Sequence, residues 1–306
     1  MPGEIRAKNG RKGAANGMMT RTDLAMEAAT AAPGTQGITQ SREKSDGVTV
    51  TRMEVTTDEA AARLGKPRGR YVTVEFSRLS EDETGLAASA EAVARELRAL
   101  LPPSGTVLVV GLGNRTVTPD MLGPQTADMV LATRHIRGEF ARTAGLEDLR
   151  PTAVLTPGVL GQTGTESGEI VRGVCREISP AAVIVIDALA ARDVRRLGCT
   201  VQLCDAGIAP GSGVGNDRKP LNAALLGIPV IGVGVPTVVD AVSLVKSMLE
   251  EPLADPAPDG TPPMMVTPRE IDVVIGRAAR LLALAINGAL QPGYAPADLI
   301  AVAHEL

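Results

Sequence analysis

The chain has 306 residues, of which 44% are hydrophobic and 22% charged, and its net charge is −4. This composition is typical of a soluble globular protein that is long enough to bury a substantial core. Aromatic residues make up only 1% and Trp is absent, so the core must be aliphatic and recognition of nucleic acid by base stacking is disfavoured. We therefore expect no nucleic-acid partner and no membrane partner.

The N-terminal third begins with a polar region. Residues 1 to about 45 carry few large apolar side chains and are expected to be poorly ordered by themselves, apart from a possible helical turn in RTDLAME at 21–27. Residues 48–55 and 71–76 alternate apolar and polar side chains, which predicts two half-exposed strands joined by a turn region. Residues 86–101 have apolar side chains at helical spacing, which predicts a helix.

The segment that organises the chain is TVLVVGLGNRTVTPDMLGP, at 106–124. Its apolar run Val107 to Leu112 is bounded by glycines, which predicts a buried parallel strand. Pro119 suits the first position of a helix, so Asp120 is expected in the first helical turn, and the helical pattern continues to His135.

Further strands and helices alternate at short spacing in the rest of the chain. This alternation predicts a mainly parallel twisted α/β sheet with helices on both faces, to which the N-terminal strands are added in antiparallel order. A Pro-rich stretch at 252–263 is expected to be a flexible linker. The predicted strands cover 153–156, 181–187, 200–205 and 228–235, and the predicted helices cover 167–178, a start at 237–240, and 267–290.

The glycine loop after the organising strand resembles a dinucleotide-binding turn, but Thr116 stands where the third glycine is needed. Only two histidines occur, His135 and His304, and no GxSxG sequence is present, so a serine hydrolase site and a histidine-held metal are both disfavoured. We therefore expect neither a metal nor a cofactor.

Two carboxylates at strand ends are the strongest candidates for chemistry. Asp120 is expected where the positive end of a helix favours the charged form, whereas Asp187 follows the apolar run VIVI, where burial disfavours it. Two acids in such different environments can divide the work of a general base and a general acid. The alternative is that Asp120 only complements a helix N-terminus and that Asp187 only caps a loop.

Five further residues are weaker candidates for binding or support. Gly113 and Asn114 follow the organising strand and offer close approach and backbone donors to a substrate. Glu166 is a candidate for substrate binding, but a negative charge near the N-terminus of the following helix explains it equally well. Asp205 is explained by a turn before Gly207, and Asp240 by a capping box with Thr237.

Several long strings stand in order along the chain and cover most of it from 21 to 290. They are RTDLAMEA, GLGNRTVTPDMLGP, ATRH, TPGVLGQTGTESGEIVRGV, VIDALAAR, GIAPGSGVGNDRK, IPVIGVGVPTVVDAV and MVTPREID. Together these strings resemble the spore germination proteases, the endopeptidases that degrade small acid-soluble spore proteins.

The resemblance implies an α/β sandwich like that of phosphorylases and hydrogenase-maturation proteases, and a tetrameric zymogen in the cytoplasm of the forespore or spore core. It implies that Asp120 and Asp187 are the catalytic aspartates. It also implies self-cleavage between Asp23 and Leu24, which divides the chain into a largely disordered propeptide, 1–23, and a single catalytic domain, 24–306.

Two features depart from the family pattern: the 252–263 linker is short, and Arg115 replaces the usual aromatic residue. Two alternatives therefore stay open at this point. One is a catalytically silent sporulation protein of the same fold that acts as a binding or structural component. The other is a nucleotide-binding α/β enzyme.

Overall fold

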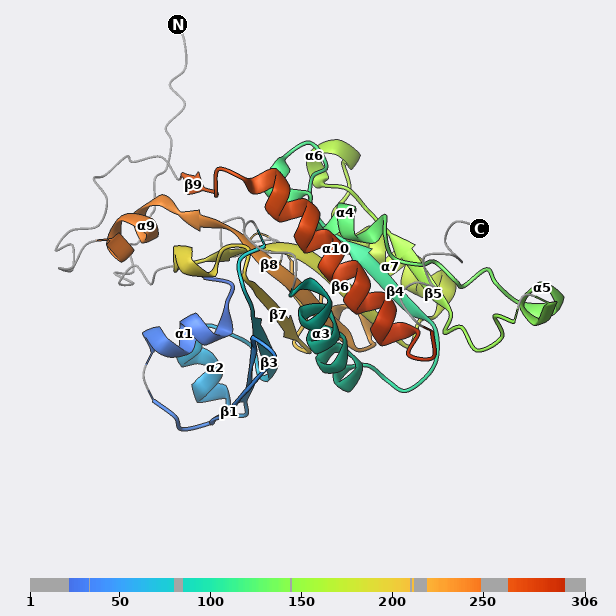
Figure 1. Ribbon diagram of the computed structural model, residues 1–306, viewed down its shortest axis with the longest axis horizontal. Helices are drawn as coiled ribbons and strands as arrows, with labels where there is room; N and C mark the ends of the chain where they lie inside the picture. The colour runs from blue at the N-terminus through green and yellow to red at the C-terminus, as the bar shows by residue number, and fades with distance from the viewer. Residues whose placement is uncertain are drawn as a thin grey trace, which may run out of the picture.

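The computed structural model describes residues 22–32, 34–79, 85–143, 145–209, 211, 219–248 and 264–294 (Figure 1). The region expected to be poorly ordered, residues 1 to about 45, lies outside the described residues at 1–21 and at 33, and the linker at 252–263 lies outside them too. The predicted division into a propeptide and one catalytic domain therefore stays a prediction. For the described part of the N-terminal region the expectation of poor order is wrong, because a helix forms at Ala25–Ala31 and a strand at Ile38–Ser45.

A nine-stranded sheet runs through the molecule in the order β1-β2-β3-β7-β8-β6-β4-β5, and β9 pairs with β8. The strands are β1 (Ile38–Ser45), β2 (Val48–Val55), β3 (Gly69–Glu75), β4 (Val107–Gly111), β5 (Thr152–Leu155), β6 (Ala182–Ala191), β7 (Thr200–Cys204), β8 (Val230–Asp240) and β9 (Met265–Val266).

The prediction of a mainly parallel sheet is wrong. Strand β4 pairs in parallel with β5 and β6, and β6 with β8, but the other five pairings are antiparallel. The physical reason lies in the connection from β6 to β7. It holds only residues 192–199 and the short 3₁₀ turn η2 (Val194–Arg196), which is too short for the crossover that a parallel pair needs. The predicted antiparallel strands at the N-terminal side are present.

Helices cover both faces of the sheet, as the alternation of strands and helices predicts. They are α1 (Ala25–Ala31), α2 (Asp58–Leu64), α3 (Leu86–Leu100), α4 (Leu122–Ala127), α5 (Gly138–Thr143), α6 (Leu160–Thr163), α7 (Ser167–Ile178), α8 (Ala223–Leu226), α9 (Ala241–Met248) and α10 (Ile271–Leu290).

Alternate side chains of the central strands feed the two layers of the core. Val107 and Val109 of β4 pack toward α3, α4 and α10, whereas Leu108 and Val110 pack toward α7 and α8. In Figure 1, α10 lies diagonally across the sheet beside α3. Helix α1 packs with α2 against the antiparallel strands at the N-terminal side.

One helix among the described residues, α10, is long and apolar enough by composition to cross a membrane. The core helix of a globular protein can have the same length and composition, and 61% of the apolar stretch of α10 is buried inside this molecule. Its buried residues include Ile275, Leu282 and Ile286, which belong to the main core cluster.

Several predicted boundaries are wrong where tertiary pairing overrides the local pattern. Strand β8 continues through Asp240, so no helix begins at 237, and α10 begins at Ile271 without a side-chain cap. The helix predicted to reach His135 ends at Ala127. Strand β1 was missed because all but its first residue are exposed, so it carries no apolar alternation.

The end of β4 and the start of α4 approach each other through two glycines. A Cβ on Gly111 would lie 2.3 Å from the carbonyl oxygen of Gly123, and a Cβ on Gly123 would lie 2.2 Å from that of Leu112. Because these neighbours are backbone atoms, they cannot move aside as a flexible side chain does.

We expect the Gly123→Ala substitution to destabilise the protein by at least about 1–3 kcal/mol, because overpacking at a backbone contact forces the helix away from the strand. Thermal unfolding of the purified variant measures this loss. The matched control is Gly173→Ala, in the exposed part of α7, where a Cβ meets nothing within 4 Å. Alanine is the better helix former, so this control should be neutral or more stable by up to about 1 kcal/mol. Equal unfolding temperatures for the two variants would contradict the proposed close contact.

Candidate functional site

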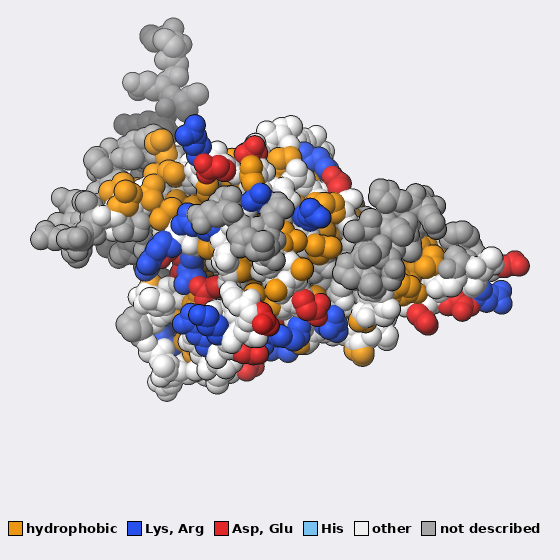
Figure 2. Space-filling view, viewed as in Figure 1, with side chains coloured by type: hydrophobic (Ala, Val, Ile, Leu, Met, Phe, Trp, Pro, Cys, Tyr) orange, Lys and Arg blue, Asp and Glu red, His pale blue; other side chains and the backbone are white. Residues whose placement is uncertain are grey.

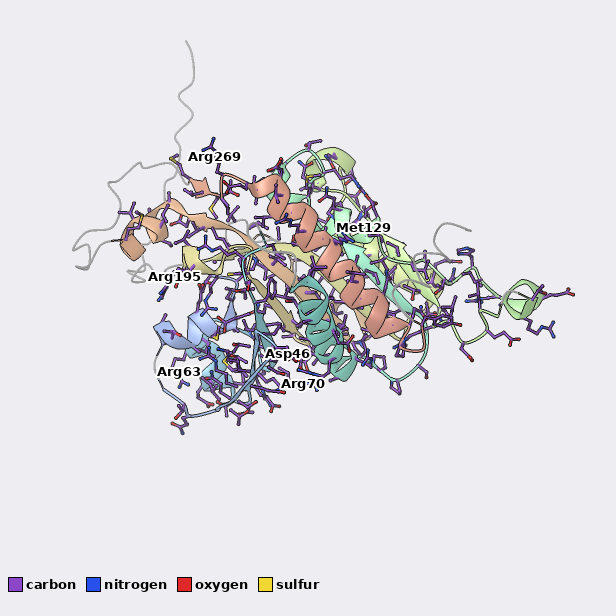
Figure 3. All side chains as sticks on the ribbon, viewed as in Figure 1. Asp46, Arg63, Arg70, Met129, Arg195 and Arg269 are labelled. Atoms are coloured by element: carbon purple, nitrogen blue, oxygen red, sulfur yellow. The ribbon has the colours of Figure 1, made fainter. Side chains whose placement is uncertain are left out.

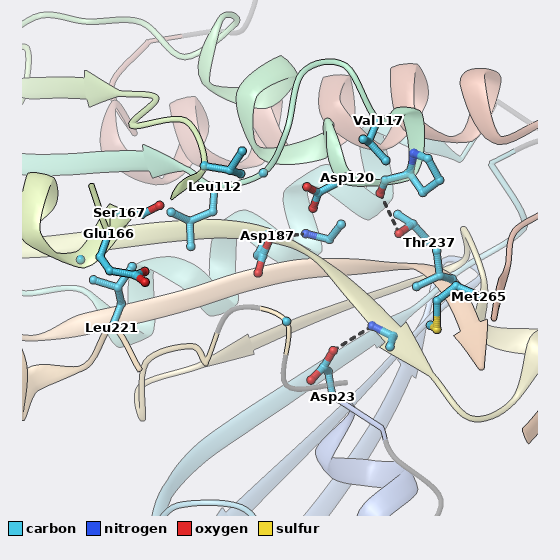
Figure 4. Close-up of a pocket in the computed structure, with 18 of the residues that line it drawn as sticks. Asp23, Leu112, Val117, Asp120, Glu166, Ser167, Asp187, Leu221, Thr237 and Met265 are labelled. Atoms are coloured by element: carbon cyan, nitrogen blue, oxygen red, sulfur yellow. Dashed lines mark hydrogen bonds between the residues drawn. The ribbon is translucent and has the colours of Figure 1, made fainter. Parts of the chain in front are cut away.

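A cavity of about 330 Å³ lies where β4 stops beside the longer β6. The last residue of β4, Gly111, pairs with Ile186, whereas β6 continues to Ala191. Asp187 therefore directly follows the last position of β6 that is in register with β4. Figure 4 shows residues around this cavity, among them Asp23, Asp120, Glu166 and Asp187. Gly113 and Lys219 also line the cavity.

Asp187 is buried, with 5% of its surface exposed. Its Oδ1 accepts a hydrogen bond of 3.0 Å from the backbone N–H of Ala188. The prediction that the strand ends at Asp187 is wrong, because β6 runs on for four more residues. The continuation is paired with β8, which was itself predicted too short.

Asp120 closes the 3₁₀ turn η1 (Thr118–Asp120) just before α4, and not the first turn of that helix as predicted. Its Oδ2 accepts a hydrogen bond of 2.8 Å from the backbone N–H of Asn114. The loop can fold back so tightly because Gly113 has φ of 122°, and a Cβ there would lie 1.9 Å from the carbonyl oxygen of Asp120. In Figure 4 the Asp120 and Asp187 side chains reach into the same cavity.

Thr237 fixes the turn that carries Asp120. Its hydroxyl donates a hydrogen bond of 2.9 Å to the carbonyl oxygen of Pro119, and the residue is fully buried in β8. Its own carbonyl accepts a bond of 3.1 Å from the hydroxyl of Thr267. Thr237 thus links the strand to the catalytic candidate, and the predicted capping role for it is wrong.

The weaker candidates divide into two groups. Gly113 and Glu166 line the cavity, and Asn114 supports Asp120 through its backbone while its side-chain oxygen accepts bonds from Thr116 and Gln162.

Asp205 and Asp240 are absent from the described residues that line the cavity. Asp205 binds the backbone and side chain of Arg70 at the start of β3, whose position Figure 3 labels. Asp240 accepts a bond from Ser243 N and caps α9.

The N-terminal segment docks beside the cavity. Asp23 donates its backbone N–H to the carbonyl oxygen of Ala190 at 2.9 Å, and its Oδ2 accepts from the N–H of Ala190 at 2.8 Å. Leu24 is fully buried among side chains of β6, β8 and the turn after β6, namely Leu189, Ala191, Leu197 and Val239. The island that the sequence predicts as a helical turn is thus the docked start of α1.

Two charged side chains fasten this segment. Glu27 is 5% exposed and accepts hydrogen bonds from the backbone N–H groups of Arg192 and Asp193 at 2.7 and 2.9 Å. Lys66 donates from Nζ to the carbonyl oxygen of Thr22 at 2.8 Å, and burial lowers the pKa of this lysine. Backbone and side-chain contacts together therefore hold Asp23 at the edge of the cavity.

Sequence reasoning missed three residues of this region, Lys66, Gln202 and Lys219, and gave Thr237 only a capping role. Gln202 stands at a polar position of an alternating strand, where a solvated side chain is the usual expectation, yet it is buried. Lys219 is the last residue of the string GIAPGSGVGNDRK, and this family resemblance is the one sequence feature that points to it. Among the described residues, no group of three or more His, Cys, Asp or Glu is placed to hold a metal ion.

The fold and the cavity define the class of this protein. It is an α/β protein with two carboxylates, Asp120 and Asp187, in a cavity where strand β6 continues beyond the end of β4. Comparison with known families gives a more specific result. The family model described as germination protease matches residues 14–254.

The germination protease of Caldanaerobacter subterraneus subsp. tengcongensis is 37% identical, and the match covers 93% of this chain and 98% of that protein. The germination protease of Priestia megaterium is 42% identical over 75% of this chain and 66% of its own length. The chain therefore belongs to the germination protease family, and it is a peptidase by that membership.

Among solved structures, the [NiFe] hydrogenase maturation protease HycI of Thermococcus kodakarensis aligns with 64% of this chain and 99% of its own, at 18% identity and a TM-score of 0.38.

We expect Thr237→Val to lower both stability and peptidase activity. The substitution keeps the shape of the side chain but leaves the part-buried carbonyl of Pro119 without its donor, at a cost of about 1–3 kcal/mol. Because the same turn carries Asp120, activity should fall further than the loss of folded protein explains. Thermal unfolding and cleavage assays on the same samples measure the two effects. Thr237→Ser keeps the hydroxyl and should restore activity; a valine variant as active as the wild type would rule out this positioning role.

Proposed function

We propose that this chain is an endopeptidase of spore germination, made as a zymogen that cleaves its own bond between Asp23 and Leu24. The observation that carries the proposal is the position of Asp23, which lines the same cavity as Asp120 and Asp187. The residue before the expected bond thus faces the same cavity as the two expected catalytic carboxylates. Small acid-soluble spore proteins are the proposed substrates of the processed form.

In the proposed reaction, Asp120 and Asp187 act together on water and the peptide. One carboxylate removes a proton from water as its oxygen attacks the carbonyl carbon of Asp23, and the other donates a proton to the leaving nitrogen of Leu24. The roles stay open, because two neighbouring acids titrate as a pair. The support is structural: Asp187 is buried beside the strand end, and a backbone N–H holds Asp120 in a tight turn.

The docked segment has the features of a bound substrate. The backbone N–H of Asp23 bonds to the carbonyl oxygen of Ala190 at the end of β6, a main-chain contact of the kind by which an extended peptide docks on a sheet edge. Leu24, just after the proposed bond, fills an apolar pocket, and Glu27 binds two backbone N–H groups and lies 3.5 Å from Arg196. Asp23, Leu24 and Glu27 therefore each occupy a binding site of their own on the protein.

We also propose that the chain forms a homo-oligomer, a tetramer, in the cytoplasm of the forespore or spore core. Exposed apolar side chains on α9 and β9 support self-association, and Figure 2 shows hydrophobic atoms gathered over these elements. Val245, Met248 and Met264 are 48%, 74% and 58% exposed. The net charge of −4 supports the absence of a nucleic-acid partner.

We expect the full-length protein, held at mildly acid pH, to yield a new N-terminus at Leu24, and Asp120→Asn and Asp187→Asn to abolish this product. Each asparagine keeps the shape of the side chain but cannot exchange a proton, which lowers the rate by about 10²–10⁴-fold. Mass spectrometry of the intact chain measures the new terminus. If both variants still process their tails and cleave spore-protein peptides, the mechanism is wrong. A wild-type chain that stays full length favours the catalytically silent alternative.

We expect Glu27→Gln to slow self-cleavage, because a neutral amide binds the N–H groups of Arg192 and Asp193 less strongly than a carboxylate does. A loss of about 1–2 kcal/mol in docking corresponds to a roughly 5–30-fold fall in the ratio of docked to undocked segment. The rate of appearance of the Leu24 terminus measures the effect. Glu54→Gln, on the exposed side of β2, is the matched control and should process at the wild-type rate. Equal rates for the two variants would exclude a role for Glu27 in docking.

A further inference from the structure

The side chain of Gln202 spans the bond that is proposed to be cleaved. Its Nε2 donates a hydrogen bond of 3.0 Å to the carbonyl oxygen of Asp23. Its Oε1 accepts a bond of 2.6 Å from the backbone N–H of Ala25. The two bonds therefore lie on either side of Leu24. The amide N–H of Gln202 is hydrogen-bonded to the carbonyl group that water must attack.

The register of the sheet explains why Gln202 and Asp187 face the same segment. Both residues pair with Gly234 of β8, Asp187 from β6 and Gln202 from β7. Side chains of directly paired residues point to the same face of a sheet, so these two stand on either side of a strand position that has no side chain. The segment at 22–25 crosses β8 at this point, because it bonds to Ala190 on β6 and to Gln202 on β7.

The glycine between them is required by close packing. A Cβ on Gly234 would lie 2.6 Å from Cγ of Leu189, and Leu189 packs against the buried Leu24. Gln202 itself is only 7% exposed, so its amide acts away from bulk water, where a hydrogen bond to a developing charge is strong.

We propose that Gln202 is the carbonyl-binding residue of this peptidase: its Nε2–H group stabilises the negative charge that develops on the oxygen of the cleaved bond. This inference rests on the proposed cleavage between Asp23 and Leu24. Water forms the new C–O bond, and the electron pair of the C=O bond moves to the oxygen held by Gln202. The C–N bond then breaks as one aspartic acid protonates the nitrogen of Leu24, and the other aspartate has taken the proton of water.

The test compares the first-order rate of self-cleavage in full-length wild type, Gln202→Glu and Gln202→Met. Hydrogen exchange of residues 22–31 in the same samples reports whether the segment stays docked. Both variants remove the N–H donor, so we expect the rate to fall about 10²–10³-fold while exchange protection is kept. Leu24→Ala is the control for docking, and it should lose protection.

A pH series separates carbonyl binding from a merely structural role. A protonated carboxyl group can donate a hydrogen bond where an amide did, so the deficit of Gln202→Glu relative to wild type should shrink as pH falls. The Gln202→Met deficit should stay constant, since a thioether carries no proton.

Three results would overturn the inference or its basis. Variants that process within about threefold of wild type would show that Gln202 is dispensable. Slow variants that also lose protection would show that Gln202 only docks the segment. A wild-type chain that never forms the Leu24 terminus would overturn the proposed cleavage itself, and the role of Gln202 with it.

Discussion

The difference in length between two neighbouring strands determines the rest of the site. Strand β4 ends at Gly111, opposite Ile186, whereas β6 continues to Ala191 because β8 still pairs with it on the other side. The backbone beyond Ile186 therefore has one partner strand and one open side. The turn that carries Asp120 fills part of this open side, and the docked N-terminal segment pairs at its far end. In the same register, a β4 longer by four residues would pair as far as Ala190 and would occupy the place of both.

Glycines make the close approaches that this arrangement needs. Gly111 and Gly123 let α4 contact the end of β4, and Gly113 lets the loop return so that the N–H of Asn114 reaches Asp120. Because Gly234 has no side chain, Leu189 can pack against its backbone, and Leu189 in turn forms part of the apolar pocket that holds Leu24. The sequence shows these glycines plainly, but the same residues suit a phosphate-binding loop. The structure shows that they serve close packing, because a Cβ at each of these positions would clash with neighbouring atoms.

Local sequence patterns predicted several of the buried strands and amphipathic helices correctly. The directions of the strands depend on pairing between distant segments and were predicted only in part. The apolar run 107–112 and the helical spacing of 167–178 matched β4 and α7 closely, because burial alone specifies them. The direction of β7 was missed, since its sequence alternates in the same way whether its neighbours run parallel or antiparallel. Motifs placed Asp120 and Asp187 beside one cavity, but no sequence pattern revealed Gln202, whose partner Asp23 is 179 residues away.

The way the segment is held also explains how a cleaved tail would leave. Asp23 and Thr22 keep their bonds to Ala190, Gln202 and Lys66 because the buried Leu24 and Glu27 hold the chain that follows. While the bond is intact, this tether gives the two residues an effective concentration on the order of millimolar at their own binding places. Cleavage removes the tether but not the bonds, and a few hydrogen bonds worth about 1 kcal/mol each cannot retain a short free peptide. The proposed reaction is therefore driven to completion by loss of its product, while helix α1 stays with the protein.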